Sequence, residues 1–269
     1  MDLGLQGAAV VVSGGTKGMG RAAAECLAAE GARVAVLARG RRGLDETVDA
    51  LAVRGSPDPV GLRADLTHAD EVDAAFEELA DRWGELHGLV NAAGPVDVGI
   101  RDFEALDDEE WLATFDIGTL SAVRCVRAAL PLLRAASWAR IVNLSAHSTR
   151  RQSPSLVAYT ASKAAMTSVG KNLAQSLAPD GILVNTVSPG SFLSEGMRAY
   201  LLAQPPERGI DPDSLTDAMR VIDEDFGHPA FLPRAGDPRE IGPLVAFLVS
   251  PLNSYMTGAN INVDGGSDF

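Results

Sequence analysis

Short apolar runs alternate with longer amphipathic segments along the chain. The run at residues 33–38 is apolar after its first position, which is typical of a strand buried on both faces of a sheet. We predict strands at residues 8–13, 33–38, 60–63, 86–91, 140–144, 182–187 and 260–263. We predict helices at residues 18–30, 70–83, 108–136, 156–177 and 238–249, with Thr67 or Asp70 capping the second. This rhythm predicts one α/β domain over residues 1–269, a Rossmann-type doubly wound parallel sheet of about seven strands with helices on both faces.

The stretch at residues 194–233 departs from this rhythm. It contains a Pro205-Pro206 pair and further prolines, with short helical pieces between them. It also carries many apolar side chains, including Tyr200 and Phe231, which a simple linker does not need. We interpret it as a helical lid over a substrate, and an ordinary surface insertion is the alternative.

A glycine-rich segment, SGGTKGMG at residues 13–20, follows the first predicted strand and opens the first predicted helix. Glycines permit a tight turn and allow a pyrophosphate to approach backbone N–H groups at the helix N-terminus. The strand–turn–helix context makes the segment a specific signal of a dinucleotide site. The residues expected to contact the dinucleotide here are Gly14, Thr16, Lys17, Gly18, Met19 and Gly20.

Further motifs follow this segment in order along the chain. They are Asp65-Leu66, Asn91-Ala92-Ala93-Gly94, Tyr159 with Lys163, Pro189-Gly190 with Ser194, Thr257-Gly258 and Asp264-Gly265-Gly266. Together with the spacing of Gly14, Gly18 and Gly20, this order resembles the classical type of the short-chain dehydrogenase/reductase family over the whole chain. The resemblance implies cofactor contacts at Asp65, Leu66, Asn91, Ala92, Ala93, Gly94, Tyr159, Lys163, Pro189, Gly190 and Ser194.

The end of the second predicted strand indicates which nicotinamide cofactor is used. An acidic residue there binds the ribose 2′-hydroxyl of NAD and repels a 2′-phosphate. The chain has Ala38 at this place, followed by Arg39, and Lys17 supplies another cation in the glycine segment. A planar guanidinium suits bidentate phosphate binding. We therefore predict NADP(H) rather than NAD(H), with Arg39 on the 2′-phosphate; Arg41 and Arg42 fit a solvated turn equally well.

Tyr159 and Lys163 are the candidate proton-transfer pair. They are four residues apart on a predicted helix and share one face. A free tyrosine titrates near about 10, so a nearby cation is needed to stabilise its phenolate. The resemblance implies that Tyr159 is the acid/base and that Lys163 lowers its pKa and holds the nicotinamide ribose.

The family's catalytic serine position is substituted in this chain. Counting thirteen residues back from Tyr159 reaches Ala146, with Ser145 and Ser148 on either side. Side chains alternate along a strand, so we expect Ser145 to point away from the pocket and favour Ser148 as the third catalytic residue. A loop shift that brings Ser145 in, or a role for His147 as a second donor, remains open, although a loop histidine is more often solvated.

The family's asparagine position is also substituted. Aligning from Trp111 places Gly118 there, with Asp116 and Thr119 on other faces of the predicted helix. A glycine inside a helix costs about 1 kcal/mol relative to alanine, so we expect close packing or a kink at this point. Either the proton relay is rebuilt from Ser148, His147 or Thr119, or the enzyme is slow, or its chemistry differs.

Composition narrows the class of protein further. The formal net charge of -13 disfavours nucleic acid and anionic membranes as partners. Apolar runs stay below the roughly 18 residues of a membrane span, and the N-terminus does not resemble a signal peptide. Cys26 and Cys125 fit buried thiols of a reducing compartment, so we predict a cytoplasmic protein. The four histidines lack metal-ligand spacing, and no metal site is predicted.

The leading hypothesis is an NADP(H)-dependent oxidoreductase that interconverts a ketone and a secondary alcohol, with Tyr159 as acid/base. An isomerase, dehydratase or cyclase that retains bound NADP(H) is the first alternative, and a non-catalytic NADP(H) sensor is the second. The apolar lid favours a fairly large, hydrophobic substrate. The family resemblance implies a homo-oligomer, a tetramer or a dimer, which the apolar faces at residues 123–133 and 166–177 fit.

Overall fold

The structure, a computed structural model, describes residues 2–95 and 101–267. Its strands are β1 (Ala9–Ser13), β2 (Arg33–Ala38), β3 (Val60–Arg63), β4 (Gly88–Asn91), β5 (Ala139–Leu144), β6 (Ile182–Pro189) and β7 (Asn260–Val263). Its α-helices are α1 (Gly18–Ala29), α2 (Arg41–Arg54), α3 (Ala69–Trp83), α4 (Asp108–Phe115), α5 (Ser121–Ala135), α6 (Val157–Leu177), α7 (Glu195–Leu202), α8 (Leu215–Phe226) and α9 (Gly242–Val249). The positions of the strands confirm the predicted pattern to within two residues at each end.

The strands form one parallel sheet of seven strands in the order β3-β2-β1-β4-β5-β6-β7. The order reverses between β1 and β4, and the carboxyl ends of the strands beside such a switch point are where doubly wound sheets bind ligands. Ser13 at the end of β1 pairs with Leu37 on one side and Asn91 on the other. The motifs that follow these strands therefore meet at one edge of the sheet.

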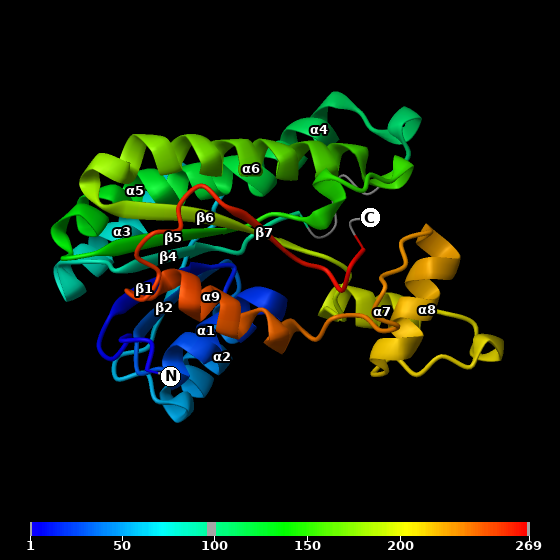
Figure 1. The fold of residues 1–269 in the computed structure, drawn as a ribbon, viewed down its shortest axis with the longest axis horizontal. Coiled ribbons are helices and arrows are strands. Elements are labelled where there is room, and N and C mark those ends of the chain that lie inside the picture. The colour runs from blue at the N-terminus through cyan, green and yellow to red at the C-terminus, as the bar shows by residue number, and fades with distance from the viewer. Residues whose placement is uncertain (1, 96–100, 268–269) are drawn as a thin grey trace.

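Both faces of the sheet are covered, as the continuous apolar strands require. Val10 and Val12 pack with α1, α2 and α9 in one core cluster. Ala9 and Val11 point to the other face and pack with α3, α5 and α6. Figure 1 shows these two helical layers above and below the sheet. The alternation along β1 thus places one strand in both cores.

Helix α2 was not anticipated from the sequence. Only Leu44, Thr47 and Leu51 of its residues are buried. Most of the helix faces solvent, so its apolar pattern is weak. Arg41 and Arg42, which we had interpreted as a possible turn, form its first turn, and Arg42 lies 3.5 Å from Glu46.

The predicted helix at residues 108–136 is interrupted. Helices α4 and α5 are joined by a π-helical segment, Asp116–Leu120, which contains Gly118. π-Helical turns inside helices are uncommon and are frequently found at functional sites. The expected irregularity at Gly118 is therefore present as a bulge that keeps the chain helical.

Residues 194–235 form a separate helical excursion beyond the carboxyl end of the sheet, where α7 and α8 lie in Figure 1. This segment has a small hydrophobic core of its own, which includes Leu201, Met219 and Ile222. The base is closed by a β-bridge between Phe192 and Gly236. Among the described residues, no helix combines the length and apolarity needed to cross a bilayer.

Candidate functional site

The proton-transfer pair lies on the first turns of α6. Lys163 is buried, and its Nζ donates a hydrogen bond of 2.9 Å to the carbonyl oxygen of Leu144, the last residue of β5. A Cβ placed on Gly94 would lie 2.9 Å from the same Nζ. The segment after β4 therefore touches the ammonium group directly, and the absence of a side chain at Gly94 is what allows this approach.

Burial shifts the pKa values of both groups away from their ordinary values. Burial lowers the pKa of Lys163 to about 8. Burial raises the pKa of Tyr159 to about 12, so the lowering by Lys163 that the family resemblance implied is not found. At neutral pH the phenol is therefore a proton donor and the lysine remains mainly a cation, which is the protonation state that carbonyl reduction requires.

The two serines beside Ala146 have different environments. The Ser145 hydroxyl donates to the Lys163 carbonyl oxygen at 2.9 Å and lies 2.8 Å from Thr167 Oγ1. It is therefore engaged with α6, the helix that also carries Tyr159 and Lys163, a partner that the alternation argument did not predict. Ser148 is buried in the short 3-10 turn His147–Thr149 and accepts a hydrogen bond of 3.3 Å from Thr160 Oγ1. Ser148 thus contacts the residue next to Tyr159.

Gly118 brings the π-helical segment directly against α6. A Cβ on Gly118 would lie 2.5 Å from Ser162 Oγ, so a side chain at this position requires Ser162 to move. Thr119 Oγ1 donates to the Ser162 carbonyl oxygen at 2.7 Å. Asp116 pairs with Arg124 at 2.6 Å. Close packing therefore occupies the place where the family's asparagine is expected. The Thr119 hydroxyl donates to the α6 backbone, so it is not available to a proton relay.

The glycine loop forms a cradle that side chains would fill. A Cβ on Gly14 would lie 2.7 Å from the Ala93 nitrogen, and Gly14 has a φ of +70°. A Cβ on Gly20 would lie 2.4 Å from the Gly14 carbonyl oxygen and 3.0 Å from Ala92 Cβ. The loop and the segment after β4 thus fit together only because these positions lack side chains. Thr16 and Met19 lie in the same loop and are half-buried.

The cations predicted to bind the 2′-phosphate lie at the rim of this cradle. Arg39 is exposed directly after β2, and Lys17 is exposed at the N-cap of α1.

The predicted Asp65–Leu66 contact lies after β3. Burial of the Asp65 carboxylate is outweighed by hydrogen bonds from Thr67, so the pKa of Asp65 is lowered. Leu66 is buried, and its carbonyl oxygen accepts a hydrogen bond of 3.1 Å from Arg124.

The remaining predicted cofactor contacts lie at the ends of β4 and β6. Asn91 is buried and donates to Asn143 Oδ1 at 2.9 Å. Pro189 ends β6, and a Cβ on the following Gly190 would lie 2.6 Å from Asp264 Cα. Ser194 caps α7, its Oγ accepting a hydrogen bond of 3.2 Å from the Met197 nitrogen.

Two features of the site were missed from the sequence. Gly18 N donates a hydrogen bond of 3.2 Å to Glu195 Oε1, which joins the glycine loop to the first residue of α7. His147 is half-buried rather than solvated; its Nδ1 lies 3.2 Å from the Pro189 carbonyl oxygen, and its ring centroid lies 6.2 Å from that of the buried His228. These contacts join residues that are far apart in the chain, so no local sequence motif predicts them.

Arg151 ties the loop after β5 to the segment that follows α8. Its guanidinium donates to the carbonyl oxygens of Pro229 at 2.9 Å, Ser267 at 3.1 Å and Gly227 at 3.1 Å. Burial and the charge of Arg151 both lower the pKa of His228, and His147 adds to this effect. The loop that carries Ser148 is thereby fixed relative to the segment after α8.

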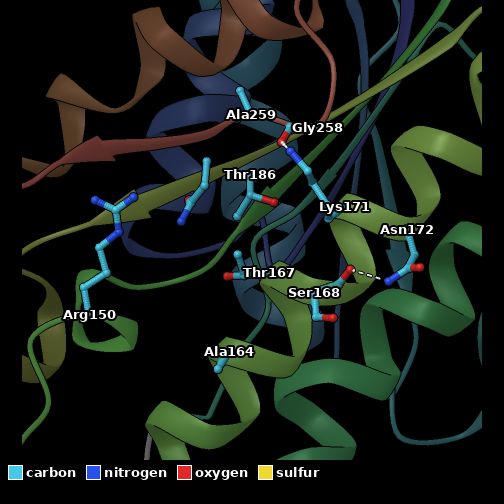
Figure 2. A pocket seen from close by; sticks show the side chains of 10 residues that line it. Arg150, Ala164, Thr167, Ser168, Lys171, Asn172, Thr186, Gly258 and Ala259 are labelled. Carbon is cyan, nitrogen blue, oxygen red and sulfur yellow. Dashed lines mark hydrogen bonds between the residues drawn. The ribbon is translucent and has the colours of Figure 1, made fainter.

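A hollow is lined by residues of α6 and by the segment that leads into β7 (Figure 2). Lys171 Nζ donates to the Gly258 carbonyl oxygen at 2.9 Å, and Asn172 Nδ2 donates to the Ser168 carbonyl oxygen at 3.0 Å. Of the described residues, its lining does not include Tyr159 or Ser148. It is therefore separate from the candidate active site.

Comparison with known proteins identifies the family. A family model described as enoyl-(acyl carrier protein) reductase matches residues 14–268. The uncharacterized oxidoreductase YvrD of Bacillus subtilis (strain 168) is 32% identical over 99% of this chain and 98% of its own length. The chain belongs to the short-chain dehydrogenase/reductase family, as the order of its motifs predicted.

Solved structures share the same architecture over nearly the whole chain. L-Sorbose reductase from Gluconobacter frateurii, solved with NADPH and L-sorbose, has a TM-score of 0.90 and 27% identity, covering 100% of this chain and 99% of its own. A short-chain oxidoreductase from Pseudomonas aeruginosa PAO1, described as containing an atypical catalytic center, has a TM-score of 0.87 and 32% identity over 96% of each chain. Both similarities extend over nearly the full length of the chains compared.

Proposed function

We propose that this protein is an NADP(H)-dependent oxidoreductase that interconverts a ketone and a secondary alcohol, with Tyr159 as the acid/base. The observation that carries the proposal is the placement of Tyr159 and Lys163 on α6, with Lys163 Nζ against Gly94 beside the glycine cradle. This arrangement puts a proton donor at the edge of the sheet where a dinucleotide fits.

The cradle fits a dinucleotide because Gly14 and Gly20 leave the loop without side chains at the point where it meets Ala92 and Ala93. Arg39 and Lys17 are available at its rim for a 2′-phosphate, and neither forms an ion pair within the described residues. When bound, the cofactor supplies the hydride. Similarity to an NADPH-bound reductase supports this choice.

In this proposal the residues of the chain handle the proton and the carbonyl. The Tyr159 hydroxyl donates a proton to the carbonyl oxygen as the carbonyl carbon is reduced. Ser148 donates a hydrogen bond to the same oxygen, in place of the missing serine at Ala146. The Lys163 cation stabilises the phenolate that Tyr159 leaves behind, because an adjacent positive charge favours the ionised form. The reverse sequence oxidises an alcohol.

The lid supports a fairly large, hydrophobic substrate. Tyr200, Leu202, Phe226, Phe231 and Leu232 are all more than a third exposed on or beside α7 and α8. Exposed apolar side chains of this number on one segment commonly mark a ligand or partner surface. Cytoplasmic location and assembly into a dimer or tetramer remain part of the proposal.

The experiment is NADPH consumption by the purified protein against ketones of graded size, with Tyr159→Phe in parallel. We expect turnover that prefers NADPH over NADH and falls by about 10²- to 10⁴-fold in the variant, the usual contribution of a positioned general acid. NADPH binding is measured separately and should survive the substitution. Turnover that is equal in Tyr159→Phe would contradict the assigned role of Tyr159.

Cofactor preference is tested by Arg39→Ala. Loss of the guanidinium should raise KM for NADPH by about tenfold and leave KM for NADH unchanged, because only NADPH carries the 2′-phosphate. Arg42→Ala is the matched control, since Arg42 pairs with Glu46 on α2. Equal effects of the two substitutions would indicate a general loss of charge and not a phosphate contact.

Non-redox chemistry with retained NADP(H) is the second candidate. It is favoured by the substitutions at Ala146 and Gly118, which remove two groups that the family uses for carbonyl reduction. It predicts tight NADPH binding and substrate conversion with no net NADPH consumption. Product analysis by mass spectrometry alongside the NADPH assay separates the two candidates.

A further inference from the structure

The carboxylate of Glu195 lies against the start of α1. Its Oε1 accepts a hydrogen bond of 3.2 Å from Gly18 N, at the first residue of α1. Its Oε2 lies 3.4 Å from the place where a Cβ on Gly18 would be, so both carboxylate oxygens face this glycine. Within residues 2–95 and 101–267, the bond from Gly18 is the only hydrogen bond or ion pair of this carboxylate.

The N-terminus of α1 is a place where an anion is stabilised. The first N–H groups of a helix have no partner within the helix, and the helix dipole places partial positive charge there. Lys17 at the N-cap is extended and makes no side-chain capping bond. The helix is therefore capped by a carboxylate from a residue 177 positions away in the chain. In a dinucleotide-binding fold this is the position of the pyrophosphate.

We propose that Glu195 competes with the cofactor pyrophosphate for the Gly18 N–H, so that NADP(H) binds only when the start of α7 withdraws from the glycine loop. Glu195 thereby sets the affinity for the cofactor and couples its binding to the position of the lid. The inference rests on the proposed NADP(H) site.

The surrounding charges do not neutralise Glu195. Arg21, Arg198 and Arg239 line the same hollow between α1 and α7. Each is paired elsewhere: Arg21 with Glu25, Arg198 with Asp213 and Arg239 with Asp237. A carboxylate about 4 Å from a phosphate is repelled. Glu195 therefore repels the pyrophosphate by its charge, and it also accepts the Gly18 N–H that the pyrophosphate would use.

The segment that carries Glu195 has a hydrophobic core of its own. Helix α7 packs with α8 in the small core around Leu201 and Met219, apart from the two main cores. It joins the domain through the Phe192–Gly236 bridge, directly before Ser194 and Glu195. In the proposal, a shift of α7 relative to this bridge withdraws Glu195 from Gly18.

The test is the dissociation constant of NADPH for the wild-type chain, Glu195→Gln and Glu195→Ala, measured by calorimetry. Both variants should bind NADPH about tenfold more tightly, since the competing charge is gone. Glu207→Gln is the matched control, because it removes the same charge from an exposed turn of the lid. Thermal unfolding checks that each variant is folded.

Adenosine 2′-monophosphate is the second probe, because it carries the 2′-phosphate but no pyrophosphate. Its affinity should not change in the Glu195 variants. Unchanged or weaker NADPH binding in Glu195→Gln and Glu195→Ala would overturn the inference. Equal tightening of both probes, or the same effect in Glu207→Gln, would also overturn it, since either result points to net charge. Failure of the wild-type chain to bind NADPH at all would refute the cofactor proposal itself.

Discussion

At the scale of single residues, the site shows how two neighbouring hydroxyls take different roles. Ser145 is bound to the backbone of α6, and Ser148 lies in the turn that approaches the residue next to Tyr159. Sequence alternation predicted that they point in different directions, but it did not predict their partners. The hydrogen-bond partners of each serine determine the effect expected from its substitution.

Ser148→Ala should lower kcat/KM by about tenfold to a hundredfold and leave NADPH affinity unchanged, because a single carbonyl hydrogen-bond donor is lost. Ser145→Ala is the matched control. It should instead lower stability by about 1–3 kcal/mol, since it leaves the buried backbone and Thr167 with one partner fewer. A larger activity loss in a folded Ser145→Ala than in Ser148→Ala would reverse the assignment.

The pKa of Lys163 predicts how activity depends on pH. Burial lowers the pKa of Lys163 to about 8, so its cation is lost as the pH rises through that value. The pKa of Tyr159 is raised to about 12, so the phenol keeps its proton over the same range. Ketone reduction should therefore be flat near neutrality and fall above about pH 8, because the phenolate formed loses its stabilising charge.

The measurement is the pH profile of kcat/KM, which reports groups of the free enzyme. Lys171→Met, on the exposed part of the same helix, should leave the profile unchanged. Lys163→Met should remove most of the turnover at every pH. If kcat/KM falls only near about pH 10.4, the ordinary pKa of a lysine, burial does not control the pKa of Lys163.

At the scale of elements, α6 organises the site. It carries Tyr159 and Lys163, and it packs directly on the π-helical segment Asp116–Leu120 through Ser162. The close approach at Gly118 is the structural counterpart of the family's missing asparagine. The π-helical geometry and the glycine act together, because the contact leaves no space for a Cβ.

Gly118→Ala tests this packing, because two effects oppose each other there. Helix propensity favours alanine by about 1 kcal/mol. Overpacking against Ser162 costs about 1–3 kcal/mol. We expect a net loss of stability, measured by denaturant unfolding, and a smaller loss when the substitution is made in a Ser162→Ala background. A variant more stable than the wild-type chain would show that the bulge tolerates a side chain.

The sequence predicted some elements better than others for identifiable reasons. The residues of β2, Arg33–Ala38, were recognised because buried parallel strands are continuously apolar. Helix α2 was missed because only a few of its residues are buried. The bulge at Asp116–Leu120 was expected only as an irregularity at Gly118, since packing against Ser162 depends on tertiary structure.

At the scale of the whole molecule, the parallel sheet brings the motifs to one edge. The strand order reverses between β1 and β4, and the glycine loop and the segment after β4 meet there. The cofactor contacts predicted for the glycine loop and for residues 91–94 depend on this topology. The contact between Gly18 and Glu195 could not be predicted in this way, because it joins the sheet domain to the α7–α8 segment, whose position no sequence motif predicts.

The central claim is that hydride passes from the nicotinamide to a carbonyl carbon while Tyr159 supplies the proton. The most direct test uses NADPH deuterated at C4 of the nicotinamide with any ketone that the protein consumes, and mass spectrometry of the product. We predict that deuterium appears on the carbinol carbon of the alcohol, and that Tyr159→Phe abolishes the product while still binding NADPH. Product formation without deuterium transfer and without NADPH oxidation would contradict the account and establish non-redox chemistry.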